Sequence, residues 1–153
     1  MRVFCTSGSP PLLEDVIDWV AARGPKLWLD HEVIEADSVS ASWEQTAIAY
    51  RQGKSPFLTE INHTTDPDAK EEVEEFVEFL EDMADTPQRR NVLSHLQRTT
   101  FVVGNQIPTS DFEDDGYDAV GEFMRFFLEH NDGMIQADGE GFYDGEGLIL
   151  KLE

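Results

Sequence analysis

The spacing of the hydrophobic residues changes several times along this chain, and those changes limit the folds that it can adopt. Apolar side chains recur every three or four residues in some segments, as on one face of a helix, and alternate or cluster in shorter, strand-like runs elsewhere. The segments with helical spacing are 12–23, 66–85, 87–97 and 117–130. The strand-like runs are 2–6, 26–35, 43–51, 57–63, 99–107 and 134–138. Helices and strands in this order predict an α+β protein.

The two ends of the chain share one pattern. A shift of 107 positions lays the apolar face of residues 13–20 on that of residues 120–127. This correspondence predicts a tandem βαββ pseudo-repeat, with pseudo-halves at about 2–63 and 99–152 and two inserted central helices at about 66–97. We therefore expect a ferredoxin-like α/β sandwich, in which an antiparallel or mixed sheet carries its helices on one face.

Length and composition favour a single domain that spans residues 1–153. Forty per cent of the 153 residues are hydrophobic, which is enough to form a core without disulfides or metal. Cys5 is the only cysteine, so no disulfide can form within the chain. Free cysteines are among the most often buried residues, and we therefore expect a buried and unreactive thiol. No segment resembles a signal peptide or reaches the length of a membrane span, which favours a cytoplasmic protein.

The net charge restricts the possible partners. The chain contains 32 Asp and Glu against 11 Lys and Arg, a formal charge of −21. Such a field repels the phosphates of nucleic acids and anionic membrane surfaces, so we expect neither as a partner. A basic protein partner, bound cations or a salty environment would each suit it. In composition alone the chain resembles the small acidic immunity proteins that neutralise bacterial toxins, and no residue carries that resemblance.

The densest charge lies in the predicted helix that begins at Asp66 and Pro67. An apolar stripe faces the core, and carboxylates occupy most of the remaining surface. This surface is either a solvated face or a binding site for a basic partner, and the acidic stretch 111–118 would add to its field. The candidate partner-binding residues are Glu71, Glu74, Glu75, Glu78, Glu81 and Asp82.

Three arginines follow this acidic helix directly: Arg89, Arg90 and Arg98. Their position predicts ion pairs between adjacent helices, each worth well under about 1 kcal/mol when exposed.

A short acidic motif is repeated near the C-terminus. Residues 138–141 (Asp-Gly-Glu-Gly) recur as residues 144–147 around Phe142 and Tyr143. Carboxylates on glycine-rich backbone are able to bind a divalent cation, although the spacing is not that of an EF-hand. The alternative, which we favour, is a closing β-hairpin whose glycines form the turns. The weak candidate metal ligands are Asp138, Glu140, Asp144 and Glu146, of which the first two would share one face of a strand.

Residues capable of acid–base chemistry are scattered along the chain. The sequence lacks a P-loop, a dinucleotide motif and a nucleophile elbow, and no two histidines have the spacing of a helical metal site. A metal-assisted hydrolase or isomerase would need a pocket assembled from distant strands. The candidates for that pocket are His31, His63, Asp138, Glu140 and Tyr143.

The predicted helix 117–130 has a wide apolar face. Phe126 extends its arc to roughly 200° at about 100° per residue, so a second layer or another subunit should cover it. The Phe126 face is therefore a candidate homodimer surface.

These patterns favour a non-catalytic acidic module that binds a basic protein partner or a small ligand, with no cofactor predicted. The expected mechanism is electrostatic attraction of the partner to the acidic helix.

Overall fold

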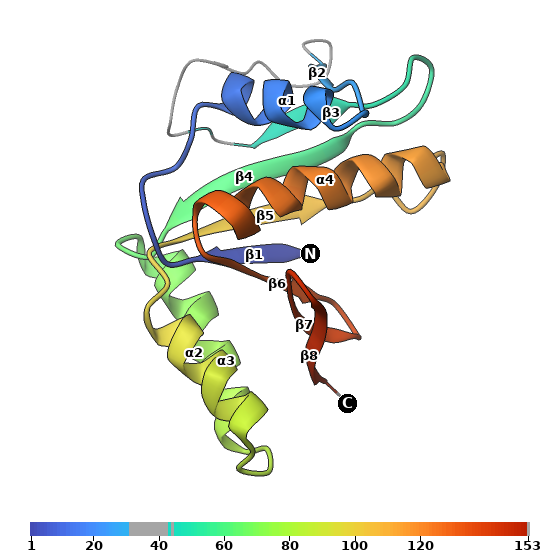
Figure 1. Cartoon of the computed structure of the whole chain (residues 1–153). Helices are drawn as coiled ribbons and strands as arrows, with labels where there is room; N and C mark the ends of the chain where they lie inside the picture. Colours follow the sequence, from blue (N-terminus) through green and yellow to red (C-terminus); the bar gives the residue numbers. More distant parts are fainter. Residues whose placement is uncertain (31–42, 44, 153) are drawn as a thin grey trace.

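The computed structural model describes residues 1–30, 43 and 45–152, and within them it contains eight strands and four helices (Figure 1). The strands are β1 (Arg2–Cys5), β2 (Trp28–Leu29), β3 (Thr46–Ala49), β4 (Phe57–His63), β5 (Phe101–Gln106), β6 (Gly133–Ala137), β7 (Gly141–Asp144) and β8 (Gly147–Lys151). The helices are α1 (Leu13–Ala22), α2 (Pro67–Glu81), α3 (Pro87–Gln97) and α4 (Asp114–His130). The predicted α+β class is confirmed.

All eight strands form one antiparallel sheet in the order β2-β3-β4-β5-β1-β6-β7-β8. The first strand lies near the centre, where Val3 is opposite Val103 of β5 on one side and Ile135 of β6 on the other. Segments from both ends of the chain therefore meet at the middle of the sheet. The strand predicted at 26–35 is present as β2, and residues 31–35 lie outside the described part of the chain.

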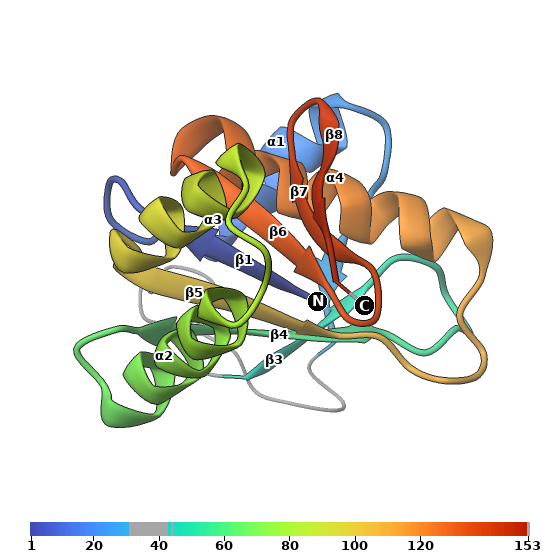
Figure 2. The same ribbon diagram turned by 90° about the horizontal axis from the view of Figure 1, so that it is seen from below.

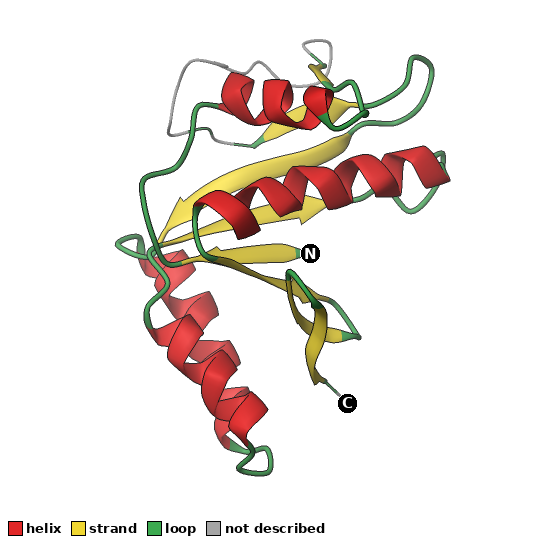
Figure 3. Cartoon of the chain, in the orientation of Figure 1, coloured by secondary structure: helices red, strands yellow, loops and turns green. Residues whose placement is uncertain are grey.

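Each face of the sheet has its own hydrophobic core. The helices α1 and α4 cover one face, and α2, α3 and the β7–β8 hairpin cover the other (Figures 2 and 3). Alternation along β1 sends Val3 to the first core and Phe4 to the second. Phe4 packs edge-on against Phe76 of α2, with ring centroids 5.6 Å apart, and lies 6.3 Å from Phe142 of β7.

The helices lie on both faces of the sheet, in contrast to the prediction of one covered face. The reason is visible in β1, where Val3, Phe4 and Cys5 are all fully buried. A strand that is apolar on both sides needs cover on both sides. The ferredoxin-like sandwich is not confirmed and stays a prediction.

The pseudo-repeat is likewise not confirmed. The first strands of the two proposed halves, β1 and β5, are antiparallel neighbours, and α1 packs beside α4. The strands that follow these helices occupy different places, however, because β2 lies at an edge of the sheet while β6 pairs with β1. The two helices α2 and α3 do lie between the proposed halves along the chain.

The wide apolar face of α4 is covered by α1 of the same chain. Phe126 is only 7% exposed, and its ring centroid lies 5.6 Å from that of Trp19 on α1. The ring of His130 stacks on Phe126 at 4.2 Å. The sheet and the neighbouring helix α1 in the same layer therefore account for the wide arc, and a homodimer through Phe126 has no support here.

The helix α4 begins at Asp114, three residues before the predicted start at Tyr117. Gly116 explains the difference, since it is buried in the first turn between two aromatic rings. A Cβ atom at this position would lie 2.7 Å from Phe112 and 2.8 Å from Tyr50. This glycine lets the helix start close to the β3–β4 hairpin instead of breaking it.

Candidate functional site

The six carboxylates proposed as a partner-binding surface are all solvent-exposed on α2. None of them forms an ion pair with another residue of the described chain. Val73 and Leu80, on the opposite face of the helix, are buried in the second core. The amphipathic pattern read from the sequence is therefore confirmed, and the carboxylates have no partner among the described residues to neutralise them.

The arginines of α3 do not pair with the α2 glutamates, contrary to our expectation. Arg89 donates instead to main-chain carbonyl oxygens at the end of α2, and Arg90 pairs with Asp85 at 2.8 Å. Arg98 donates to the carbonyl oxygen of Ser94. Arg89 is the nearest cation, and it is already engaged at the negative end of the α2 dipole, where the last carbonyls of a helix have no intrahelical donor.

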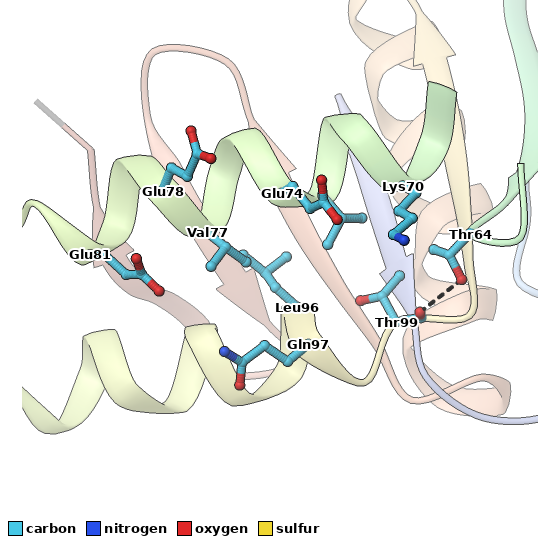
Figure 4. A pocket seen from close by; sticks show the side chains of 10 residues that line it. Thr64, Lys70, Glu74, Val77, Glu78, Glu81, Leu96, Gln97 and Thr99 are labelled. Atoms are coloured by element: carbon cyan, nitrogen blue, oxygen red, sulfur yellow. Dashed lines mark hydrogen bonds between the residues drawn. The ribbon is translucent and has the colours of Figure 1, made fainter. Parts of the chain in front are cut away.

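A groove of about 460 Å³ runs between α2 and α3 (Figure 4). Its apolar lining comes from Val73, Val77 and Leu96. Along one side it is lined by three of the six carboxylates, Glu74, Glu78 and Glu81. At the other end lie Lys70, Thr64 and Thr99, where the Thr64 hydroxyl donates to the Thr99 carbonyl at 3.1 Å. The groove thus combines apolar surface with a one-sided row of negative charge.

The second acidic stretch, residues 111–118, differs from α2 because nearby cations pair with three of its five carboxylates. Arg51 makes a bidentate contact with Asp115, at 3.0 and 2.6 Å. Lys54 lies 3.3 Å from Asp111 and 3.0 Å from Glu113. Hydrogen bonding to Arg51 lowers the pKa of Asp115. Pairing therefore weakens the field of residues 111–118 relative to that of α2, and the prediction that they add to it stays a prediction.

The C-terminal motif forms two tight turns in a three-stranded meander of β6, β7 and β8. We had expected Asp138 and Glu140 on a strand. They lie instead in the first turn, because β6 ends at Ala137. Asp144 ends β7, and its carboxylate accepts a hydrogen bond of 2.8 Å from the amide of Glu146. Among the described residues, no group of three or more His, Cys, Asp or Glu side chains is placed to hold a metal ion.

Two of the candidate catalytic residues do meet. The Tyr143 hydroxyl donates to Glu140 at 3.3 Å, and both residues line a cavity of about 470 Å³ between α4 and the turns. Burial and the adjacent Glu140 raise the pKa of Tyr143. Asp138 is directed elsewhere, to Arg2, whose Nη1 lies 3.1 Å away.

The remaining candidates are not brought to this place. His63 ends β4 beside Phe101 of β5, whereas Asp138 follows β6, beyond the opposite end of the register. Three strand spacings of about 4.8 Å separate β4 from β6 laterally, and the offset along the strands adds more than about 10 Å. His31 lies outside the described residues.

Two buried titratable groups have structural roles. Cys5 is fully buried, and burial raises the pKa of its thiol, as expected for an unreactive core cysteine. His95 of α3 is 5% exposed, and its Nε2 lies 2.7 Å from the carbonyl oxygen of Phe4. His95 was not among the residues predicted from the sequence, although its position three residues after Val92, on the apolar face of the helix, indicates burial.

Arg2 is a second residue whose structural role was not predicted from the sequence. Its side chain contacts Glu72 of α2 at 2.5 Å, Asp138 at 3.1 Å and Gln136 of β6 at 2.9 Å. Burial acts to raise the pKa of Asp138, but hydrogen bonds from Gln136 and Arg2, together with nearby positive charge, lower it overall. These contacts join three elements that are far apart in the sequence, and no local pattern reports such a junction.

Comparisons with known proteins returned no family model, no curated protein and no solved structure that matches this chain. Within the described residues, the helices are too short or too polar to span a membrane.

Proposed function

We propose that this protein is a non-catalytic interaction module whose α2 surface binds a basic segment of another protein. The observation that carries the proposal is the row of exposed α2 carboxylates, which have no ion-pair partner in the described chain although cations lie nearby. A protein that already has a charge of −21 gains no stability from unpaired carboxylates at i and i+4, since like charges at that spacing destabilise a helix. A basic partner would remove that repulsion.

The groove between α2 and α3 indicates the form of the partner. An amphipathic helix could place an apolar side chain on Val77, the partly exposed member of the apolar lining, and its Lys or Arg residues beside the carboxylates. Charge would then direct the encounter and fix the side of the helix that faces the groove. We rank this role ahead of the metal-assisted hydrolase or isomerase, because His63 and Asp138 are separated across the sheet.

The test is binding of a synthetic helix that carries a leucine stripe and lysines at i and i+4 spacing, followed by fluorescence anisotropy at rising NaCl. We expect affinity at low salt that falls as the salt concentration rises. The triple variant Glu74→Gln, Glu78→Gln and Glu81→Gln removes the groove carboxylates. Its control, Glu71→Gln, Glu75→Gln and Asp82→Asn, changes the net charge equally on the outer side of the same helix.

We expect the groove variant to lose about tenfold or more in affinity, and the control to lose clearly less. No binding at low salt, or an affinity that does not respond to salt, would refute the proposal. Equal losses in both variants would leave only a diffuse field and reject the groove.

A further inference from the structure

A second, smaller cavity lies on the other side of α2, over the sheet face that the helix leaves uncovered. Its volume is about 260 Å³, below the usual range of about 300–1,000 Å³ for drug-sized ligands. Glu72 lines it from α2, at a helical position roughly 200° around the axis from Glu74 of the groove. The other polar residues used below are Arg2, Glu60, Asn62, Gln106 and Asp138, which also line it.

The positive groups of this cavity are already engaged. Arg2 is held by Glu72, Asp138 and Gln136. The N-terminal ammonium donates to the carbonyl oxygen of Asn105 at 3.1 Å and lies 3.7 Å from Asp138. Neither cation is therefore available to attract an anion from solution.

Glu60 is the opposite case. Its side chain is half-buried on β4 and extends over Gly104 of β5, where an added Cβ would lie 3.6 Å from Cγ of Glu60. It makes no ion pair or hydrogen bond with any other described side chain, and the same holds for the amides of Asn62 and Gln106. A partly desolvated carboxylate next to free amide oxygens is complementary to a cation that carries several N–H donors.

We propose that this cavity binds a small organic cation, a free primary amine or guanidine, through Glu60 and the neighbouring amides. Glu60 supplies the charge, and the side-chain oxygens of Asn62 and Gln106 accept from the remaining N–H groups. Gly104 provides the space, because any larger residue there would reach toward Glu60. The site is independent of the proposed protein-binding groove, since the two lie on opposite sides of α2.

The test uses agmatine, which carries both an ammonium and a guanidinium, in a titration of the ¹⁵N-labelled full chain followed by two-dimensional NMR. We expect saturable shifts at the amides of β4 and β5 around Glu60 and Gly104. Glu60→Gln preserves the shape of the side chain and should weaken binding about tenfold, the loss expected for one charge-assisted hydrogen bond. Gly104→Val, which suits a strand, should block the cavity and weaken binding similarly.

The control is Glu74→Gln, which makes the same charge change in the groove and should leave agmatine binding unchanged. Equal binding by the Glu60→Gln and wild-type chains would overturn the proposal, as would shifts spread over all carboxylates without saturation. Unchanged dispersion of the NMR spectra verifies that each variant is folded. Because the groove variants leave Glu60 and Gly104 unchanged, either proposal can fail while the other stands.

Discussion

Arg89 Nη1 lies 3.0 Å from the carbonyl oxygen of Glu81, so the first turn of α3 caps the last turn of α2. The same nitrogen contacts the carbonyl oxygens of Leu80 at 3.3 Å and Met83 at 3.1 Å. The side chain is 16% exposed, and it also lies 3.3 Å from Asp85. One cation thereby links the last turn of α2 and the residue Met83 after it to the first turn of α3.

Arg89→Met should destabilise the protein by about 2–3 kcal/mol, because it removes the side-chain donor that these carbonyl groups share while keeping much of the side-chain volume. Urea denaturation measures the free energy of unfolding. Arg90→Met is the control, since the Arg90 side chain is exposed and, among the described residues, its one polar contact is the carboxylate of Asp85; its loss should cost less than about 0.5 kcal/mol. Equal effects would show that the cap is not what stabilises the helix pair.

The two acidic glycine motifs should respond differently to the same substitution. A Cβ at Gly141 would lie 2.1 Å from the carbonyl oxygen of Leu150, and its φ is +153°, so Gly141→Ala should destabilise by at least about 2 kcal/mol. Gly145 has nothing within 4 Å of an added Cβ, so Gly145→Ala should be within about 0.5 kcal/mol of wild type. Thermal unfolding of the pair tests the difference, and a tolerated Gly141→Ala would contradict the close packing of β7 against β8.

The buried imidazole of His95 should make stability depend on pH. Burial lowers its pKa below the ordinary value of 6.5, although the hydrogen bond to the Phe4 carbonyl opposes this. The unfolded chain therefore binds a proton first as the pH falls, and the stability contributed by neutral His95 declines below about pH 6.5.

His95→Gln should flatten the decline in unfolding free energy between about pH 7.5 and 5.5. Identical slopes for wild type and His95→Gln would show that His95 is not the responsible group.

Removing one negative charge from α2 should change the free energy of unfolding in opposite directions on the two sides of the helix. Glu78 lies four residues from both Glu74 and Asp82, so Glu78→Gln relieves two repulsions and should stabilise by roughly 0.5 kcal/mol at low salt. Glu72→Gln weakens the ion pair with Arg2 and should destabilise by up to about 1 kcal/mol. Chemical denaturation at low and high NaCl measures both, and the two differences should shrink with salt. Stabilisation by both variants would mean that general repulsion outweighs the Arg2 contact.

Phe142 should be the residue of the C-terminal hairpin that most affects stability. It is fully buried, and its ring centroid lies 5.9 Å from that of Phe76 on α2. Phe142→Ala should cost about 3–5 kcal/mol by leaving a cavity between the hairpin and the helix. Leu148→Ala on the same hairpin, at a site that is 50% exposed, should cost less than about 1 kcal/mol. Calorimetry measures the unfolding free energy of both variants. If Phe142→Ala costs as little as Leu148→Ala, the hairpin does not belong to the cooperative core.

The helices could be predicted because their signals are local. Asp66-Pro67 and Thr86-Pro87 mark helix starts within one turn of the chain, and Thr86 does accept a hydrogen bond from the Arg89 amide at 3.1 Å. The start of α4 was placed too late because Gly116 belongs to the helix only through its packing with Tyr50 and Phe112. A glycine read by itself indicates a turn.

In the candidate sites, too, the features that depend on local sequence could be predicted and those that depend on tertiary contacts could not. The exposed face of α2 follows from its period, so its six carboxylates could be named from the sequence alone. The partners of Arg2 could not, because Glu72, Gln136 and Asp138 meet it only after β1 pairs with β6 and α2 packs below the sheet.

The sequence by itself determined the α+β class, the amphipathic helices, the acidic face of α2 and the glycine turns around Phe142, since each depends on residues a few positions apart. Only the tertiary structure decided which strands are neighbours, that helices cover both faces of the sheet, and that Arg89 binds carbonyls at the end of α2 instead of its glutamates. Those outcomes depend on the burial of β1 on both sides and on contacts between residues about a hundred positions apart, such as Phe4 with Val102 and Met134. The spacing of apolar residues within one segment does not indicate which distant segments it will contact.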